Sequence, residues 1–416
     1  MARNLDPEDI PNGWNYGLLD NFTERCSGHT PSKSHSQYWG GGIKWISLSD
    51  SSKLDRGYVY ETDKEISLEG INNSSAKLHP AETVVLSRDA GIGKSGVMVE
   101  PMAVSQHFIA WKCDNKVNIN SWFLYNWLQL HKAEFERQAV GSTIKTIGLP
   151  YFKKLNIAIP PYSEQRKIAK ILSTWDKAIS TTERLIDNSK QQKKALMQQL
   201  LTGKKRLLDE SGRPFEGEWE DVTLGNVSNI NSGGTPKSSV DEYYGGDIPW
   251  VSIADMTKHG KWIYKTNKYL TQDGLVNSTA RIYPRNTLLY AMYASIGECS
   301  IAKVKLSSSQ AILGIRPNKC LDHEFLYFYL GSLKEKIKLQ GQQGTQANLN
   351  AAMVKNFTLK LPSLEEQQKI VNVLTNADKE IVLLEKQLAD LQQEKKALMQ
   401  QLLTGKRRVS IIKQGE

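Results

Sequence analysis

One segment of the chain comes within a single residue of a phosphate-binding loop. The run from Ala90 to Ser95 reads A-G-I-G-K-S. A phosphate-binding loop has the pattern G-x-x-x-x-G-K-[ST], which puts its first glycine at position 88, and the chain has Arg88 there. We therefore predict that this segment binds no nucleotide.

A second segment resembles part of a methyl-transfer motif. Ile159-Pro-Pro-Tyr162 is close to the N-P-P-Y motif of DNA adenine methyltransferases, whose polar first residue holds the target amino group. Ile159 has no polar side-chain atom, and the prolines are better explained as the entry to a helix. The seven histidines form no metal-ligand pattern, and no G-x-S-x-G motif occurs. The chain is therefore predicted to bind rather than to catalyse, with no metal site.

The composition favours a folded, basic protein with an anionic partner. The 416 residues carry 54 Lys and Arg against 44 Asp and Glu, a net charge of +10, and 39% are hydrophobic. This length suits two or three domains, and the charge makes nucleic acid the first candidate partner. The four cysteines are scattered, and no apolar run reaches the roughly 18 residues of a membrane span. We therefore expect no disulfide scaffold and a cytoplasmic location.

The chain contains one unit of about 200 residues twice. KKALMQQLLTGKKR, from Lys193 to Arg206, returns as KKALMQQLLTGKRR from Lys395 to Arg408, and weaker matches precede both segments. The tails are nearly identical, whereas the globular parts share only a skeleton. The tails are therefore expected to do one shared job and the globular parts two versions of another. Duplication without functional meaning is the alternative.

Each tail is predicted to be one long helix. Apolar residues step by four and three from Ile168 to Leu200 and again from Ile370 to Leu402, which is the pattern of a coiled-coil seam. A helix of about 40 residues is roughly 60 Å long and needs a partner, and the other tail is the obvious one. The short connection after Gly203 favours an antiparallel pair with pseudo-two-fold symmetry, as a rod with a globule at each end. Polar seam residues such as Ser189 indicate either local fraying, register control or an opening for a partner.

The predicted fold class is α+β (mixed α/β), with two similar globular domains that are each followed by a long helix. Glycine turns followed by apolar runs indicate strands, and aromatic-rich stretches such as Asn120–Arg137 indicate shorter helices. The predicted divisions are domain 1 (1–160), helix 1 (161–203), a linker (204–218), domain 2 (219–362), helix 2 (363–405) and a basic tail (406–416).

Several segments occur in both halves and together resemble one family. They are GHTPSK (28–33), YWGGGI (38–43), WISL (45–48), SGGTPK (232–237), PWVSIAD (249–255), the helix starts PPxxEQxxI (160–168) and PxxEEQxxI (362–370), and LLTG (200–203 and 402–405). The chain resembles the specificity subunit of type I restriction–modification systems over nearly its whole length. The double arrangement of recognition domain and long helix is more specific than any single motif.

This resemblance implies a non-catalytic DNA-recognition subunit. Each recognition domain would read one half of a bipartite sequence in double-stranded DNA, and the helices would fix the gap and hold two adenine-N6 methyltransferase subunits. Motor-nuclease subunits are possible further partners. S-adenosylmethionine, ATP and magnesium would bind to the partner subunits, so no cofactor is expected on this chain and no membrane contact is implied.

Polar loop residues are the candidates for DNA reading, because Arg, Lys, Asn, Gln, Ser and Thr supply the donors and acceptors that match base edges. In the first domain they are Thr30, Ser32, Lys33, Ser47, Ser49, Asp50, Arg88, Lys94, Thr143 and Lys145. In the second domain they are Thr235, Lys237, Ser238, Ser252, Asp255, Tyr290, Tyr293, Thr345, Gln346 and Asn348. For each one, a phosphate contact or a solvated loop is the alternative.

The nearly identical ends of the tails are the candidates for contact with the methyltransferase subunits. They are Lys193, Leu196, Gln199 and Leu200 in the first copy and Lys395, Leu398, Gln401 and Leu402 in the second. The alternative is that these residues pack only against each other. Two other functions also remain open: a coiled-coil scaffold that never touches DNA, and an orphan DNA-binding protein outside a restriction complex.

The modular interpretation predicts the outcome of a domain exchange. Replacing residues 1–158 with the recognition domain of another family member should change one half of the methylated target and leave the other half as it was. Mapping of adenine methylation in a host that expresses the hybrid measures this. A change in both halves, or in neither, would contradict the modular interpretation.

Overall fold

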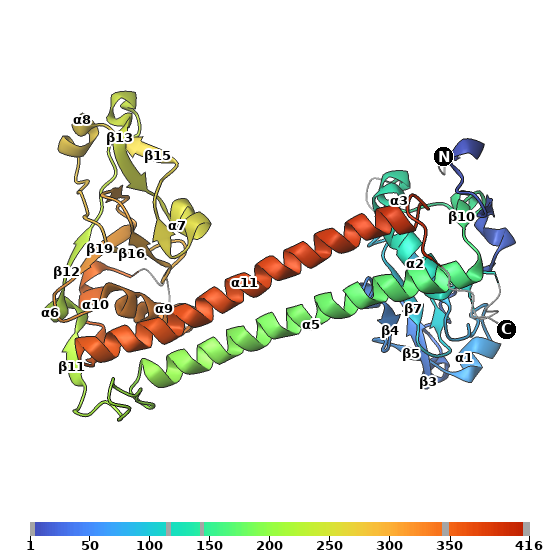
Figure 1. Ribbon diagram of the computed structural model, residues 1–416, viewed down its shortest axis with the longest axis horizontal. Helices are drawn as coiled ribbons and strands as arrows, with labels where there is room; N and C mark the ends of the chain where they lie inside the picture. Colours follow the sequence, from blue (N-terminus) through green and yellow to red (C-terminus); the bar gives the residue numbers. More distant parts are fainter. Residues whose placement is uncertain (1–4, 114–117, 142–144, 343–348, 411–416) are drawn as a thin grey trace. The chain divides into compact units, whose positions relative to one another are not determined.

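The computed structural model describes residues 5–113, 118–141, 145–342 and 349–410. The chain divides into two compact units. Unit 1 comprises residues 1–183 and 386–416, and unit 2 comprises residues 184–385. Each unit therefore contains one globular domain and one half of each of the two long helices, α5 and α11 (Figure 1).

The globular domain of unit 1 consists of three small sheets and short helices. Its strands are β1 (Asn15–Leu18), β2 (Glu24–Ser27), β3 (Trp39–Ile46), β4 (Tyr58–Val59), β5 (Glu65–Ile66), β6 (Val84–Ser87), β7 (Ser95–Met98), β8 (Ala103–Val104), β9 (Phe108–Lys112) and β10 (Asn156–Ile159). Its helices are α1 (Leu68–Asn72), α2 (Ser121–Leu130), α3 (Lys132–Gln138) and α4 (Leu149–Lys153), followed by α5 (Tyr162–Leu200). Single 3-10 turns are η1 (Pro7–Asp9), η2 (Leu19–Asn21), η3 (Ser36–Tyr38) and η4 (Leu48–Ser52).

Unit 2 repeats this arrangement. Its strands are β11 (Glu220–Thr223), β12 (Ser228–Ser232), β13 (Tyr244–Val251), β14 (Trp262–Ile263), β15 (Lys268–Leu270), β16 (Leu288–Ala291), β17 (Cys299–Ala302), β18 (Ser307–Ser308), β19 (Ile312–Pro317) and β20 (Thr358–Leu361). Its helices are α6 (Leu224–Val227), η5 (Asp241–Tyr243), α7 (Ile253–His259), α8 (Gln272–Val276), α9 (His323–Gln342) and α10 (Ala351–Lys355), followed by α11 (Leu364–Leu402).

The sheets of the two units have the same strand order, which confirms that the repeat seen in the sequence is a repeat of structure. Unit 1 has sheets β2-β9-β6-β7-β4, β5-β3-β8 and β1-β10, and unit 2 has β12-β19-β16-β17-β14, β15-β13-β18 and β11-β20. Both long middle strands carry a bulge, between Trp39 and Ile43 in β3 and between Tyr244 and Ile248 in β13. The expected α+β class is therefore confirmed.

The central strand of each five-stranded sheet is buried on both faces. All four residues of β6 and all four of β16 are buried, as expected for short apolar runs without alternation. In unit 1 the sheet packs against α2, and the core continues into the first turns of α5 through Ile168 and Leu172. The last turn of α11 closes the same core with Met399 and Leu402. The corresponding core of unit 2 contains the end of α5 and the start of α11.

The two long helices form the predicted seam in each unit. The apolar positions from Ile168 to Leu200 and from Ile370 to Leu402 are buried or half-buried, while most residues between them are exposed. Both helices begin directly after the proline pair or Pro-Ser that the sequence indicated. Gly203 and Gly405, just past the helix ends, have φ near +70°, which confirms the predicted glycine C-cap signals.

Ion pairs within each unit fix the direction and register of the helix pair. In unit 1, Lys395 donates to Asp176 Oδ1 at 2.5 Å, and in unit 2 the equivalent Lys193 donates to Asp378. In each pair the lysine lies in the C-terminal half of one helix and the aspartate in the N-terminal half of the other. The two helices therefore run antiparallel. The lysines that interrupt the apolar seam therefore control its register and do not mark fraying.

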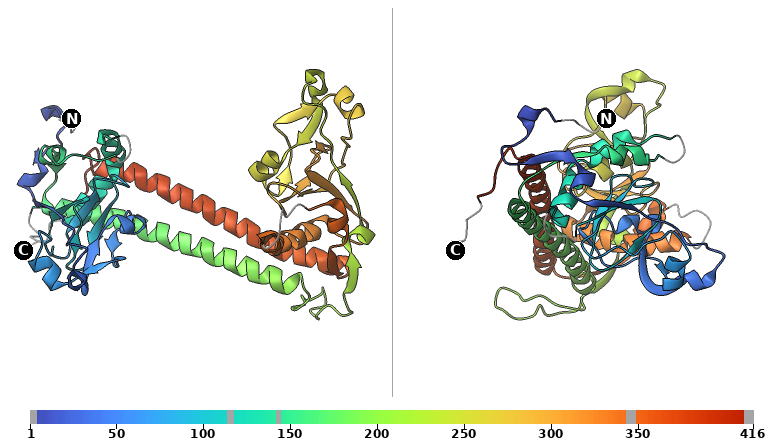
Figure 2. Two further views of the ribbon diagram at one scale, coloured as in Figure 1. Left: turned by 180° about the vertical axis from the view of Figure 1, so that it is seen from behind. Right: turned by 90° about the vertical axis from the view of Figure 1, so that its right-hand side faces the viewer.

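A second pair of ion pairs joins the segment after one helix to the start of the other. Arg408 donates two hydrogen bonds to the buried carboxylate of Glu164 at 2.7 and 2.6 Å in unit 1. Arg206 makes the same bidentate contact with Glu366 in unit 2, at 2.7 and 2.8 Å. In unit 1, Arg408 also donates to Asn12 O at 2.5 Å. The end of α11 lies beside the N-terminal segment there (Figure 2).

Removal of the arginine should destabilise unit 1. Arg408→Ala leaves the Glu164 carboxylate buried without its partner, and we expect a loss of about 1–3 kcal/mol, or roughly 2–8 °C in Tm. Thermal unfolding followed by circular dichroism measures this. The neighbouring exposed Arg407, whose side chain has no described ion pair, is the matched control as Arg407→Ala. Equal effects of the two substitutions would contradict a structural role for the pair.

Candidate nucleic-acid interface

Side-chain contacts bring three of the predicted loops of the first domain together. The hydroxyl of Thr30 donates to the amide oxygen of Gln106. The next residue, His107, lies with Nδ1 at 2.5 Å from Asp89 Oδ2, and Thr146 donates to the other oxygen of Asp89. The loops around residues 30, 88 and 145 therefore meet, although they are far apart in the sequence.

The fourth loop of the first domain joins the same group. Lys94 donates from Nζ to the carbonyl oxygen of Ser51 at 3.0 Å, which ties the turn between β6 and β7 to η4. Among the candidates of this domain, the side chains that reach solvent most freely are Ser32, Lys33, Ser49 and Lys145. Thr143 lies outside the described residues.

The second domain repeats part of this arrangement. Its Gln310 N–H donates to the hydroxyl of Thr235 at 3.5 Å, at the positions that correspond to Gln106 and Thr30. The exposed candidates here are Thr235, Lys237, Ser238 and Tyr293. Thr345, Gln346 and Asn348 lie outside the described residues.

Four of the candidate residues cap short helices instead of facing solvent. Asp50, which is fully buried, accepts hydrogen bonds from the backbone N–H of Ser47 at 2.9 Å and of Asp63 at 2.7 Å. Asp255 accepts in the same way from Ser252 N at 2.9 Å, and both pairs form capping boxes. A buried carboxylate with these partners holds the chain after the tryptophan strand, so we assign all four a structural role.

Tyr290 also lies in the interior. Its side chain is fully buried in the core of unit 2, beside Phe357, and burial raises the pKa of its hydroxyl. Its neighbour in the predicted set, Tyr293, is on the exposed turn after β16. Burial therefore separates two tyrosines that the sequence alone treats alike.

Gln106 and Gln310 are exposed residues that the sequence reasoning missed. Both follow a buried serine at the end of a short strand, and both lie beside the threonine of the Thr-Pro loop. Glutamine can make paired hydrogen bonds to adenine. The signal that could have found them is their preservation between two halves that otherwise differ on the surface.

The candidate partner residues divide into two faces of each helix end. Leu200 and Leu402 are buried in the cores of units 2 and 1, and Leu196 and Leu398 pack against those cores. Lys193 and Lys395 make the register ion pairs. Gln199 and Gln401 are exposed.

Comparison with known families decides what this repeated unit is. The model of the type I restriction modification DNA specificity domain matches the chain twice, over residues 11–189 and 216–393. The chain belongs to this family. The two matched ranges cover the two globular domains and most of the long helix that follows each of them.

Curated relatives match this specificity chain over two thirds or more of its length in some cases and over less in others. The putative type I restriction enzyme MjaX specificity subunit of Methanocaldococcus jannaschii is 27% identical over 420 residues, covering 96% of this chain and 95% of the relative. The EcoR124I/EcoR124II specificity subunit of Escherichia coli is 25% identical over 282 residues, covering 64% of each chain. The relatives are specificity subunits and the matched domain is a DNA specificity domain, so the family is one of recognition and not of catalysis.

Solved structures share the fold. The S subunit from M. genitalium aligns with a TM-score of 0.56 and 16% identity, over 99% of this chain and 100% of that one. A chain from a structure of type I complex assembly and conformational transition aligns with a TM-score of 0.63 and 18% identity, over 96% and 99%. The expected family and the expected repeat of domain and long helix are thus confirmed.

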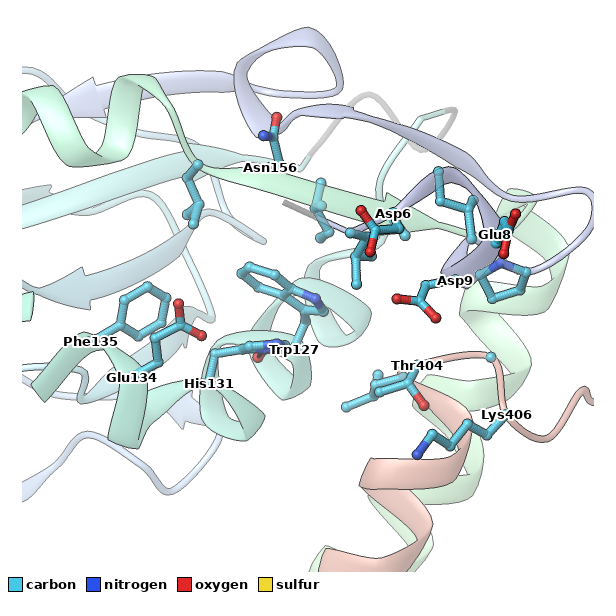
Figure 3. A pocket seen from close by; sticks show the side chains of 18 of the residues that line it. Asp6, Glu8, Asp9, Trp127, His131, Glu134, Phe135, Asn156, Thr404 and Lys406 are labelled. Atoms are coloured by element: carbon cyan, nitrogen blue, oxygen red, sulfur yellow. Dashed lines mark hydrogen bonds between the residues drawn. The ribbon is translucent and has the colours of Figure 1, made fainter. Parts of the chain in front are cut away.

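A cavity of about 700 Å³ in unit 1 has the wrong charge for nucleic acid. It lies between the N-terminal segment, α2, α3, β10 and the end of α11, and Figure 3 shows Asp6, Asp9 and Trp127 around the same space. Four of its lining residues are acidic: Asp6, Glu8, Asp9 and Glu134. Carboxylates repel phosphate, so this cavity is not part of the candidate interface.

The described residues offer neither a metal site nor a membrane span. Over the described ranges, no group of three His, Cys, Asp or Glu side chains is placed to hold a metal ion. No helix in the same part of the chain is long and apolar enough to cross a bilayer.

One buried histidine distinguishes the core of the first specificity domain from that of the second. His79 is 1% exposed, and neither ring nitrogen has a hydrogen-bond partner among the described residues. Burial lowers the pKa of His79 from 6.5 to about 4. The corresponding Tyr283 donates instead to Asn231 O at 3.1 Å.

The histidine should make unit 1 sensitive to acid. In the unfolded chain His79 binds a proton near pH 6.5, whereas in the folded chain it does not accept one until about pH 4. The contribution of neutral His79 to the free energy of unfolding is therefore complete above pH 6.5 and is lost as the pH falls towards 4. The loss reaches about 3 kcal/mol. His79→Leu should flatten the dependence of Tm on pH between 7 and 4.5, whereas the exposed His35→Gln should not. An unchanged pH profile in His79→Leu would exclude this source.

Proposed function

We propose that this chain is the DNA-specificity subunit of a type I restriction–modification complex and that each globular domain reads one half of a bipartite site. The observation that carries the proposal is that both units share one backbone arrangement but present different side chains on their exposed loops. Both units have the same strand order and the same capped helix after the tryptophan strand. Their exposed loops differ, as two unlike half-sites require. The named relatives, all specificity subunits, support the same function.

Double-stranded DNA is the proposed ligand of the polar loops. The chain has a net charge of +10, and much of the affinity for DNA comes from neutralising phosphates. In the first domain the linked loops present Thr30, Ser32, Lys33, Arg88, Lys94 and Lys145, and in the second Thr235, Lys237, Ser238 and Tyr293 take this role. Gln106 and Gln310 join the proposed interface because each contacts its loop threonine.

The paired helices are proposed to set the gap between the two half-sites. The lysine–aspartate pairs permit one antiparallel register, because a shift by one residue would separate each charge from its partner. In this proposal the fixed register is what would hold the gap constant. The division of the chain into domains 1–160 and 219–362, with helices 161–203 and 363–405, is the organisation on which this proposal rests.

The exposed face of the repeated helix ends is the proposed docking surface for two methyltransferase subunits. Within the preserved segment, the inner face is used by the core and the register ion pairs. The outer face is exposed and has the same residues in both copies: Lys194, Ala195, Gln198 and Gln199, and Lys396, Ala397, Gln400 and Gln401. Packing against the core explains preservation of the leucines but not of these exposed residues. Two identical docking faces suit two identical partners.

The chemistry is proposed to reside in the partner subunits. Adenine-N6 methyl transfer would use S-adenosylmethionine bound to the methyltransferase subunits, and ATP and magnesium would serve a motor-nuclease subunit where one joins the complex. This chain would supply the choice of site. No residue of this chain is proposed as a catalytic residue.

Methylation mapping tests the proposal. The chain is co-expressed with the methyltransferase subunit, and adenine methylation across the host genome is compared with that in cells expressing the subunit alone. We expect a new bipartite motif with a fixed gap only when this chain is present. A stable complex of the two proteins without a new motif would favour a coiled-coil scaffold. Sequence-dependent DNA binding by this chain, with neither a complex nor a new motif, would favour an orphan DNA-binding protein.

A further inference from the structure

The turn between the two central strands of each five-stranded sheet has the same backbone in both domains. In the first domain Arg88 N donates to His107 O at 3.0 Å and Gly93 N to Ser87 O at 3.0 Å. In the second domain Met292 N donates to Ala311 O at 2.9 Å. Gly297 N donates to Ala291 O at 3.1 Å, and Ala291 is the equivalent of Ser87. The two turns are therefore one frame that presents two sets of side chains.

The side chains on this frame differ in chemistry. Arg88 and Asp89 of the first turn correspond to Met292 and Tyr293 of the second, and His107 corresponds to Ala311. Met292 is buried in the core of unit 2, so the second turn presents no cation at this point. A contact that both half-sites need, such as one to the DNA backbone, would have been kept in both turns.

Arg88 is held in place with unused hydrogen-bonding capacity. Its side chain is only 20% exposed, and its Nε is buried without a hydrogen-bond partner among the described residues. The nearest carboxylate oxygen, Asp89 Oδ1, is 3.8 Å away, which is too far for a hydrogen bond. A guanidinium offers five donors in one plane, and a buried donor without an acceptor is costly. Because Nε itself is shielded from solvent, a ligand can reach this guanidinium only through its exposed part.

Asp89 is fixed by two other loops, so the position of the turn is defined before any ligand binds. His107 and Thr146 contact its two carboxylate oxygens, and Ile147 N donates to Arg88 O at 2.9 Å. The carboxylate is 14% exposed and lies beside the guanidinium. Its negative charge disfavours an incoming phosphate more than a neutral base edge.

We propose that Arg88 reads a guanine in the half-site bound by the first domain, through the paired O6 and N7 acceptors in the major groove. Asp89, His107 and Thr146 are positioning residues that hold the arginine for this contact. The proposal rests on the proposed function and adds to it a base, a residue and a half-site. It also states that the second half-site lacks this contact, because Met292 replaces the arginine.

The test maps methylation by the complex that contains this chain and its methyltransferase subunit. The wild-type motif should contain a guanine in one half-site at which Arg88→Ala relaxes the choice of base. Discrimination at that one position should fall about 5- to 150-fold, which corresponds to the loss of one bidentate pair. The other half-site should be unchanged. Arg56→Ala, at an exposed arginine of the same domain outside the turn, is the matched control.

A second substitution separates base reading from phosphate binding. Arg88→Lys keeps the charge but loses the planar pair of donors. If Arg88 reads guanine, Arg88→Lys should relax the same position while the salt dependence of DNA binding stays near that of the wild type. If Arg88 binds phosphate, Arg88→Lys should behave as the wild type and Arg88→Ala should weaken all sequences equally, and the inference would be overturned.

The positioning residues have their own readout. Asp89→Asn and Thr146→Val should relax the same guanine position as Arg88→Ala, and Asp89→Asn should add little to Arg88→Ala in the double variant. Relaxation at a different position, or none, would remove the positioning role. A wild-type motif without a guanine at any Arg88-dependent position would overturn the inference and leave the proposed function standing. The absence of any motif dependent on this chain would overturn the proposed function itself.

Discussion

The antiparallel register of α5 and α11 is the constraint on which the rest of the structure depends. Each unit uses half of each helix, and in each unit one lysine from the repeated KKALMQQLLTG segment meets one aspartate in the first half of the other helix. The same register brings an arginine beyond each helix to a buried glutamate. Each half of the chain therefore completes the unit to which the other half belongs.

The two globular domains keep the frame constant and change what it presents. Close backbone approaches set the frame. A Cβ on Gly28 would lie 2.1 Å from Val104 O, and one on Gly233 would lie 2.3 Å from Ser308 O, so both positions require glycine. The indole N–H of Trp45 donates to His29 O and that of Trp250 to Gly234 O, and each acceptor directly follows one of these glycines. With these contacts fixed, loop side chains can diverge without altering the strands that carry them.

The sequence predicts the repeat, the long helices and the fold class well, because these rest on periodicity and on near-identity over long segments. It does not predict which polar residues are exposed and which are buried. Asp50 and Tyr290 are of residue types that suit DNA, yet one caps a helix and the other fills a core. Gln106 escaped notice because its partner Thr30 lies 76 residues away. The lysine pairs of the seam were visible as interruptions, but their partners were set by a register that only the paired helices define.

The division of the helices between the units also sets the order in which the molecule can be completed during synthesis. The core of unit 2 uses Leu200 and Leu201, which the ribosome delivers before the domain they serve. The core of unit 1 includes Met399, Leu402 and Leu403, which emerge almost 400 residues after Trp14 in the same cluster. The domain translated first is thus the last to close, and until then part of its core lacks the side chains that cover it.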